Sequence, residues 1–162
     1  MSSASDRVWD IIEKVGVCML TTHSADGLRA RPLEARPNRD AETIWFVTDV
    51  RGRKDDEVGE DANVCLIFID HADKAYLSIT GTASVRTDPA KVAEIWKKTD
   101  DVWWPGGPDD PNVLVLEFQP RVAELWDGPA SQAVAAFEFA KARATGTKPK
   151  LGENRKVTVP LR

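Results

Sequence analysis

The sequence contains few of the residue types on which catalytic and metal sites depend. Among 162 residues there are two histidines, two cysteines and one tyrosine. His23 and His71 belong to no metal-ligand spacing and have no accompanying carboxylate cluster, so we expect no metal site. Neither GxSxG nor GxGxxG occurs, which argues against a nucleophile elbow and a Rossmann nucleotide site. No catalytic residue can be named from motifs.

Long apolar runs and a concentrated basic surface are also missing. No run approaches the roughly 20 apolar residues that a membrane helix needs, and the opening MSSASDRVWD resembles no signal peptide. Acidic and basic residues are interspersed at a net charge of −4, which disfavours binding to nucleic acid. Cys18 and Cys65 lie in apolar runs and are expected to be reduced, buried thiols. We expect a cytoplasmic protein with no membrane or nucleic-acid partner.

The composition is that of a folded domain. Hydrophobic residues make up 42% of the chain and charged residues 30%. A length of 162 residues fits one domain with its own core. We expect this domain to span residues 1–144, followed by a basic, extended arm over residues 145–162.

Hydrophobic periodicity predicts a mainly β fold with peripheral helices. Helices are expected over 8–15, with Ser5 and Asp6 at its start, over 53–59, after Asp88, and after a cap at Ser131. The expected strands are 17–22, 28–35, 43–48, 63–70, 75–86, 113–118 and 121–126, the last two separated by Pro120. Tight turns join most of these strands, which favours an antiparallel barrel over a doubly wound parallel sheet.

The segment WFVTDVRGRK, residues 45–54, has the composition of a phosphate site. It runs from a strand into the first turn of an expected helix. Thr48, Arg51, Arg53, Lys54 and the backbone near Gly52 offer a hydroxyl, cations and free amide groups, which together suit a phosphate. The alternative is a solvated basic turn whose charges pair with the acidic residues at 55–57.

The segment LRARPL, residues 28–33, places two arginines on one face of a strand. Arg29 and Arg31 could hold an anionic or electron-rich ligand. Pro32 restricts this strand to an edge or a bulge. The alternative is a surface edge in which the arginines pair with Asp26 or Glu34.

Five segments in a fixed order resemble a known family. RARPL, WFVTD with the RK that follows, VCLIFID, YLSITGTASV and VLVLEFQPRVAELWDG are similar to the general stress protein branch of the pyridoxamine 5′-phosphate oxidase-like, flavin-binding split-barrel family. The resemblance extends to about residue 128. It implies an antiparallel split β-barrel of the α+β class with peripheral helices, and a homodimer with flavin mononucleotide (FMN) at two sites between the subunits.

The resemblance also implies which residues hold the cofactor. Arg31, Pro32 and Leu33 would face the isoalloxazine, and Thr48, Arg53 and Lys54 would hold the 5′-phosphate, with Asp49 as a further cofactor-binding residue. Trp104 and Trp126 would approach the flavin from the partner subunit. The family commonly has serine before the basic pair, where this chain has Gly52. No pyridoxal-phosphate subsite can be placed, which makes pyridoxamine-phosphate oxidation a poor expectation.

The expected function is that of a flavin-dependent oxidoreductase acting on an unknown small substrate. The cofactor would carry the chemistry, and the expected partner is a small redox substrate or a reduced nicotinamide. One alternative is a non-catalytic stress protein that stores flavin or senses redox state. Others are a deazaflavin-binding reductase, a protein that binds flavin adenine dinucleotide (FAD), or a module without a ligand. The scarcity of histidine disfavours haem.

Overall fold

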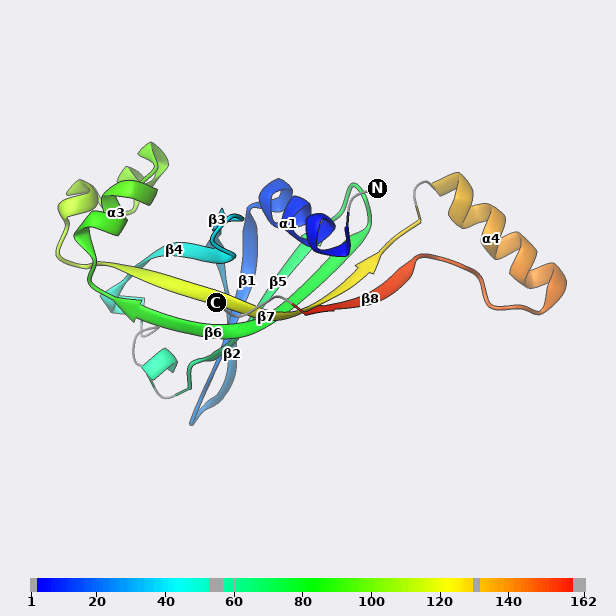
Figure 1. Ribbon diagram of the computed structural model, residues 1–162, viewed down its shortest axis with the longest axis horizontal. Helices are drawn as coiled ribbons and strands as arrows, with labels where there is room; N and C mark the ends of the chain where they lie inside the picture. Colours follow the sequence, from blue (N-terminus) through cyan, green and yellow to red (C-terminus); the bar gives the residue numbers. More distant parts are fainter. Residues whose placement is uncertain (1–2, 53–56, 60, 130–131, 159–162) are drawn as a thin grey trace.

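The computed structural model describes residues 3–52, 57–59, 61–129 and 132–158. They form an antiparallel sheet with one helix packed against it and two others at opposite ends (Figure 1). The strands are β1 (Val17–Ser24), β2 (Gly27–Glu34), β3 (Arg36–Asn38), β4 (Thr43–Asp49), β5 (Asn63–Asp70), β6 (Ala75–Arg86), β7 (Val113–Asp127) and β8 (Glu153–Thr158). The helices are α1 (Ala4–Val15), α3 (Pro89–Ile95) and α4 (Gln132–Thr145), with short 3₁₀ segments η1 (Val50–Gly52), η2 (Lys98–Val102) and η3 (Gly107–Asp109).

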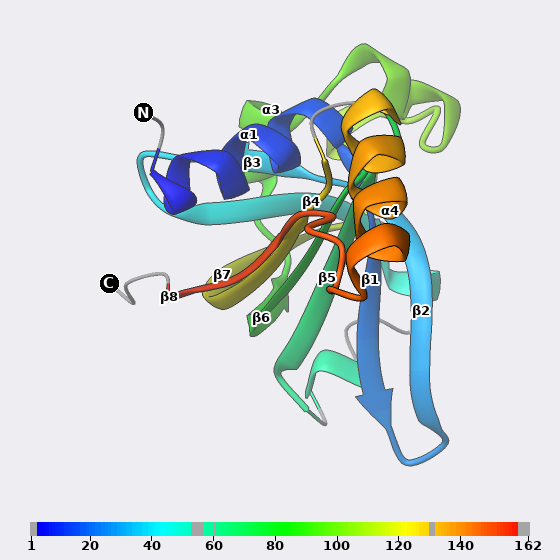
Figure 2. The same ribbon diagram turned by 90° about the vertical axis from the view of Figure 1, so that its right-hand side faces the viewer.

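The strand order is β2-β1-β5-β6-β7-β4-β3, and β8 pairs with β7. Every pairing is antiparallel, which confirms the expected class. Figure 2 shows how strongly the sheet twists, so that the β1–β2 hairpin runs in a different direction from β7 and β8.

Helix α1 closes the core and begins earlier than the sequence predicts. Ser3 is its N-cap, because the Ser3 hydroxyl accepts from the Asp6 amide at 3.0 Å and the Asp6 carboxylate accepts from the Ser3 amide at 2.9 Å. The expectation that Ser5 caps this helix is therefore wrong. The helix ends at Gly16, whose φ of 74° suits a residue without a Cβ.

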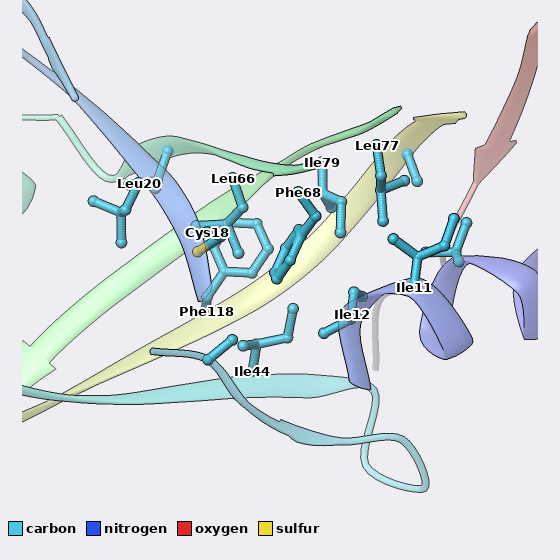
Figure 3. Packing of buried hydrophobic residues seen from close by; sticks show 14 of the residues in the cluster. Ile11, Ile12, Cys18, Leu20, Ile44, Leu66, Phe68, Leu77, Ile79 and Phe118 are labelled. Carbon is cyan, nitrogen blue, oxygen red and sulfur yellow. The ribbon is translucent and has the colours of Figure 1, made fainter. Parts of the chain in front are cut away.

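Strand alternation builds the main core. In β6 the residues Leu77, Ile79, Gly81 and Ala83 face inward, as the sequence predicts. Figure 3 shows side chains of α1 packing with those of β4, β5, β6 and β7. The largest fully buried side chains are Phe46, Phe68, Phe118, Ile11, Ile12, Leu20, Ile44, Leu66, Leu77, Ile79, Leu116 and Leu125.

Strand β7 continues through Pro120, so the expected break into two strands is wrong. Pro120 lies opposite Gly81, where the pairing of β6 with β7 shifts register. A bulge at this point accommodates a residue that cannot donate to the ladder. A Cβ on Gly81 would lie 2.2 Å from the Gln119 carbonyl oxygen, so the crossing requires glycine.

Two short strands and two 3₁₀ turns were not expected. Strand β3 spans only three residues, and β8 pairs the C-terminal arm with its own chain. The segment 100–112, for which no helix or strand is expected, contains the end of η2 and all of η3. Of the helix expected over 53–59, residues 57–59 are helical and 53–56 lie outside the described residues, as does the expected cap Ser131.

A second apolar cluster fixes the segment that follows α3. It consists of the buried residues Trp45, Val47, Val92, Val113 and Val115, against which Ile95, Trp96 and Trp104 pack. Helix α3 and this segment lie at the opposite end of the sheet from α4 (Figure 1). The second cluster therefore anchors the turn from Lys97 to Trp104, called here the tryptophan turn, beside the ends of β2 and β4.

Candidate functional site

A cavity of about 490 Å³ lies between the ends of β2 and β4 and the turn after α3. Its size is within the usual range for small-molecule sites. The lining residues are Val17, Pro32, Leu33, Glu34, Arg36, Val47, Thr48, Asp49, Arg51, Asp100, Trp103 and Trp104.

The hydroxyl of Thr48 is a buried polar group in the wall of the cavity. The residue is 2% exposed, and its Oγ1 has no hydrogen-bond partner within the described part of the chain. Buried hydroxyls almost always have a partner, because an unmade hydrogen bond costs about 1–3 kcal/mol. A ligand oxygen in the cavity would supply the missing partner.

Asp49 and Arg51 continue the wall at the end of β4. The Asp49 carboxylate accepts from the Arg51 backbone amide at 2.7 Å and from its Nε at 2.8 Å. Trp104 Nε1 also donates to Asp49, at 2.8 Å. The bonds from Arg51, and to a lesser extent the one from Trp104, hold the pKa of Asp49 well below its usual range. Asp49 is thus a fixed anion that ties the tryptophan turn to β4.

The other side of the cavity contains a buried ion pair. Arg36 donates through one terminal nitrogen to both oxygens of Asp100, at 2.7 and 2.8 Å. The two side chains are only 8% and 7% exposed. Arg36 Nε has no partner among the described residues. Beside this pair, Lys97 donates to Glu34, so two ion pairs join the tryptophan turn to the end of β2 and to β3.

An apolar wall separates these polar ends. Pro32 and Leu33 come from β2, Val17 from β1 and Val47 from β4. Trp104 adds an indole that packs against Trp96, with ring centroids 5.9 Å apart and the planes tilted by 55°. A cavity with apolar sides and separate polar ends suits a flat heterocycle that carries a polar tail.

Arg31 does not line this cavity in its own chain. Its guanidinium donates to Glu57 and, at 2.8 Å, to Thr22. Glu57 also accepts from Thr22 at 2.6 Å and from Arg29 at 2.9 Å. Burial alone would raise the pKa of Glu57, but these hydrogen bonds and the charge of Arg31 outweigh it and lower the pKa. The structure therefore pairs both arginines with Glu57 rather than with Asp26 or Glu34.

The cavity brings together five of the nine predicted cofactor residues. These are Pro32, Leu33, Thr48, Asp49 and Trp104. Arg31 lies in the Glu57 network, and Trp126 lies on β7 opposite Tyr76 and Asn154, away from the cavity lining. Arg53 and Lys54 lie outside the described residues.

Six residues of the cavity lining were not predicted for the site, namely Val17, Glu34, Arg36, Val47, Asp100 and Trp103. Arg36 and Asp100 are 64 positions apart, so only tertiary structure unites them. Trp103 was visible as part of a loop, but no pattern singled it out. By contrast Thr48 was recognised because strand, hydroxyl and basic residues follow one another locally.

The remaining features of the described residues concern metal binding, membrane-spanning helices and the two cysteines. Within the described ranges, no group of three or more histidine, cysteine or acidic side chains is arranged to hold a metal ion. Within the same ranges, no helix combines the length and the apolar character needed to span a bilayer. Cys18 is buried and Cys65 half-buried, and neither forms a disulfide. Burial raises the pKa of the Cys18 thiol to about 12.

Fold and cavity together define a helix-decorated antiparallel split barrel with a small-molecule pocket at one end of the sheet. The family model described as pyridoxamine 5′-phosphate oxidase like matches residues 3–150, and the chain belongs to this family.

Relatives within the family are general stress proteins. General stress protein 26 of Bacillus subtilis is 27% identical over 89 residues, which cover 53% of this chain and 63% of that protein. A crystal structure described as a general stress protein 26 from Jannaschia sp. CCS1 has a TM-score of 0.75 at 28% identity, covering 98% of this chain and 100% of that one. A general stress FMN/FAD-binding protein from Xanthomonas citri has a TM-score of 0.69 at 28% identity, covering 77% and 89%.

Proposed function

We propose that this protein binds FMN in the cavity and acts as a flavin-dependent oxidoreductase on a small substrate. The 5′-phosphate would lie at the end of β4, near Thr48 and Arg51, with Arg53 and Lys54 as further cations. The isoalloxazine would lie against Pro32 and Leu33. The name of the Xanthomonas citri relative supports a flavin without distinguishing FMN from FAD.

The observation that carries this proposal is the buried hydroxyl of Thr48, which has no hydrogen-bond partner among the described residues. A phosphate oxygen would accept from Oγ1, and such charge-assisted bonds are among the stronger ones. Trp104 and Arg51 hold Asp49 by hydrogen bonds, which leaves the adjacent backbone and Arg51 in a fixed arrangement. The residues present therefore fit a phosphate-bearing ligand.

The test compares two threonines of the same strand. Thr48→Val removes a hydroxyl without a partner, so we expect FMN affinity to fall about tenfold or more while the ligand-free protein keeps or gains stability. Thr43→Val removes a hydroxyl that donates to the Ala41 carbonyl at 3.0 Å. It should lower stability by about 1 kcal/mol and leave FMN affinity unchanged. FMN titration and urea unfolding measure both effects.

Equal losses of affinity in the two variants would overturn the assignment of Thr48 to the phosphate. Failure of the wild-type protein to retain FMN at concentrations far above those in a cell would overturn the proposed cofactor. Titrations with FAD and with a deazaflavin would then decide between the two remaining flavin-like ligands.

The oxidoreductase role rests on what such a cofactor supplies. Bound flavin exchanges a hydride or electrons with its substrate, and the protein has only to bind, orient and tune it. We propose that Arg31, whose Nε has no partner in the described chain, adds positive charge near the pyrimidine edge. Arg31→Ala should then lower flavin affinity or reduction potential.

The second candidate function is a flavin store or redox sensor without turnover. It requires the same cavity, so the two functions differ only in reaction rate. Oxidation of reduced nicotinamide by the FMN-loaded protein, at a rate above that of free FMN, would support the enzyme. Absence of any such rate would favour the store or sensor.

We further propose a homodimer. One face of the sheet carries a half-exposed apolar strip, which consists of Met19, Ile67, Ile69, Tyr76, Val122 and Trp126. The strand register places Met19 opposite Ile67, and Tyr76 between Ile69 and Trp126. Contiguous apolar patches of this kind often mark subunit contacts. The position of Trp126 in the strip is consistent with its reaching a cofactor of the partner subunit.

A further inference from the structure

The tryptophan turn is organised around Asp100. The Asp100 carboxylate accepts from the Lys97 amide at 2.8 Å. Its backbone carbonyl accepts from the amides of Trp103 and Trp104, at 2.9 and 3.0 Å. A single buried residue therefore sets the shape of the whole turn.

Three side-chain contacts attach the tryptophan turn to three strands. Lys97 donates to Glu34 at the end of β2, and Asp100 accepts from Arg36 in β3. Trp104 donates to Asp49 at the end of β4. Buried ion pairs are weak contributors to stability but fix geometry well. The position of the turn across the cavity is thus defined from both sides.

Trp103 differs from the other aromatic residues of the turn. Trp104 is bonded to Asp49 and packs on Trp96, whose own Nε1 donates to Asp101 at 3.0 Å. Trp103 lines the same cavity, yet it is 74% exposed, and its indole makes no hydrogen bond or ring contact among the described residues. A large apolar ring on an anchored turn is therefore available to a ligand.

We propose that Trp103 is the aromatic residue that packs on the flat ring of the bound flavin, from the same chain that holds the phosphate. Arg36 and Asp100 are positioning residues, because they act on the ligand through the turn that carries Trp103. This inference rests on the proposed flavin site. It differs from the expectation that tryptophans reach the flavin only from a partner subunit.

The test compares Trp103 with its neighbour Val102. Val102 is 78% exposed and does not line the cavity. Stacking of aromatic rings adds to the effect of area burial, so Trp103→Ala should weaken FMN binding about tenfold and restore emission of the bound flavin. Trp103→Phe should keep most of the affinity. Val102→Ala should change neither affinity nor emission.

Riboflavin separates the ring from the phosphate. Because it has the ring without the phosphate, Trp103→Ala should weaken riboflavin and FMN by the same factor, whereas Thr48→Val should weaken FMN alone. Unchanged FMN affinity and emission in Trp103→Ala would overturn the inference and leave the flavin site standing. A changed sedimentation coefficient with unchanged affinity would assign Trp103 to a subunit contact and also overturn it. Failure of wild-type protein to bind FMN would overturn both proposals.

The positioning role has its own readout. Asp100→Asn should increase emission of bound FMN when Trp103 is present and have no further effect in the Trp103→Ala background. Arg36→Lys keeps a cation opposite Asp100 and should preserve the quenching of bound FMN. This variant tests the positioning role if Asp100→Asn does not fold. Equal effects of Asp100→Asn in both backgrounds would show a purely structural role and overturn this part.

Discussion

At the residue scale, the buried carboxylate of Glu57 joins strands β1 and β2 to the helical residues 57–59. Glu57 is 4% exposed and accepts from three side chains, those of Thr22, Arg29 and Arg31. It directly follows residues 53–56, which include the two expected phosphate cations. This cluster therefore connects the phosphate segment to the strand expected to face the flavin ring.

We expect Glu57→Gln to destabilise the protein by about 1–3 kcal/mol, because it leaves Arg31 in a largely buried position without a countercharge. The Arg31 side chain is 12% exposed. Urea unfolding measures the loss. Glu94→Gln is the matched control, since Glu94 pairs with Lys91 at 62% exposure and should change stability by less than about 0.5 kcal/mol. Similar effects of the two substitutions would contradict the buried-network account.

The acid stability of the protein should depend on carboxylates whose pKa is lowered. A hydrogen bond from Lys14 lowers the pKa of Asp70, and bonds from Arg51 lower that of Asp49. A carboxyl with a lower pKa in the folded state binds fewer protons when folded. Its stabilisation is complete above the unfolded value of about 3.9 and is lost as the pH falls through the folded value.

We therefore expect the free energy of unfolding to fall steeply below about pH 4 and to change little, through these two groups, between pH 5 and 8. Asp70→Asn should make the acid limb less steep, because one of the linked protons is removed. Urea unfolding at a series of pH values measures this. An acid limb of unchanged slope in Asp70→Asn would remove Asp70 from the account.

At the element scale, the crossing of β6 and β7 allows one long strand to pair with three others. Strand β7 forms antiparallel pairs with β6, β4 and β8, and the bulge opposite Gly81 allows it to bend. A Cβ at Gly81 would also lie 2.7 Å from the Phe118 ring. Strands β6 and β7 therefore meet at one close backbone approach.

Gly81→Ala should destabilise the protein by about 2 kcal/mol or more, because neither the Gln119 carbonyl nor the Phe118 ring can move freely. Gly59→Ala is the control, since a Cβ there meets nothing within 4 Å. Thermal unfolding of the two variants measures the difference. A Gly81→Ala protein as stable as the wild type would contradict this account, because it would show that β6 and β7 can move apart at Gly81 without loss of stability.

The elements that the sequence predicts well are those with a local pattern. The alternation in β6 and the helical spacing of α1 each reflect one buried face, and both are confirmed. Strand β3 spans three residues, too few for a pattern, and β8 exists through its pairing with β7. The break predicted at Pro120 failed because the bulge depends on Gly81, far away in the chain.

The same distinction applies to the site. Thr48 and Asp49 were predicted from one continuous segment, and the cavity contains both. The Arg36–Asp100 pair joins two segments with no local signal, and Trp103 is distinguished only by its exposure within the folded chain. The phosphate cations Arg53 and Lys54 stay predictions.

At the scale of the whole molecule, the apolar strip on the sheet predicts the assembly. Sedimentation of the wild-type protein should give twice the mass of one chain. Tyr76→Asp, in the middle of the strip at 48% exposure, should shift the population to monomer, because it places a charge in an apolar contact. Leu28→Asp is the control, since Leu28 is 77% exposed at the β1–β2 hairpin and outside the strip.

A dimer that survives Tyr76→Asp but is lost in Leu28→Asp would place the interface at the hairpin instead. A monomeric wild-type protein would contradict the homodimer. In that case Trp126 would have no route to a cofactor of a partner, whereas the cavity residues of a single chain would be unaffected.

The central claim is that the end of β4 holds the phosphate of a flavin in a cavity of a single chain. The most direct test is a side-by-side titration of the wild-type protein with FMN and with riboflavin, which differ by that phosphate alone. We expect FMN to bind at least about tenfold more tightly, and the difference to decrease in Thr48→Val. Equal affinities for the two ligands, or binding of neither, would contradict the account.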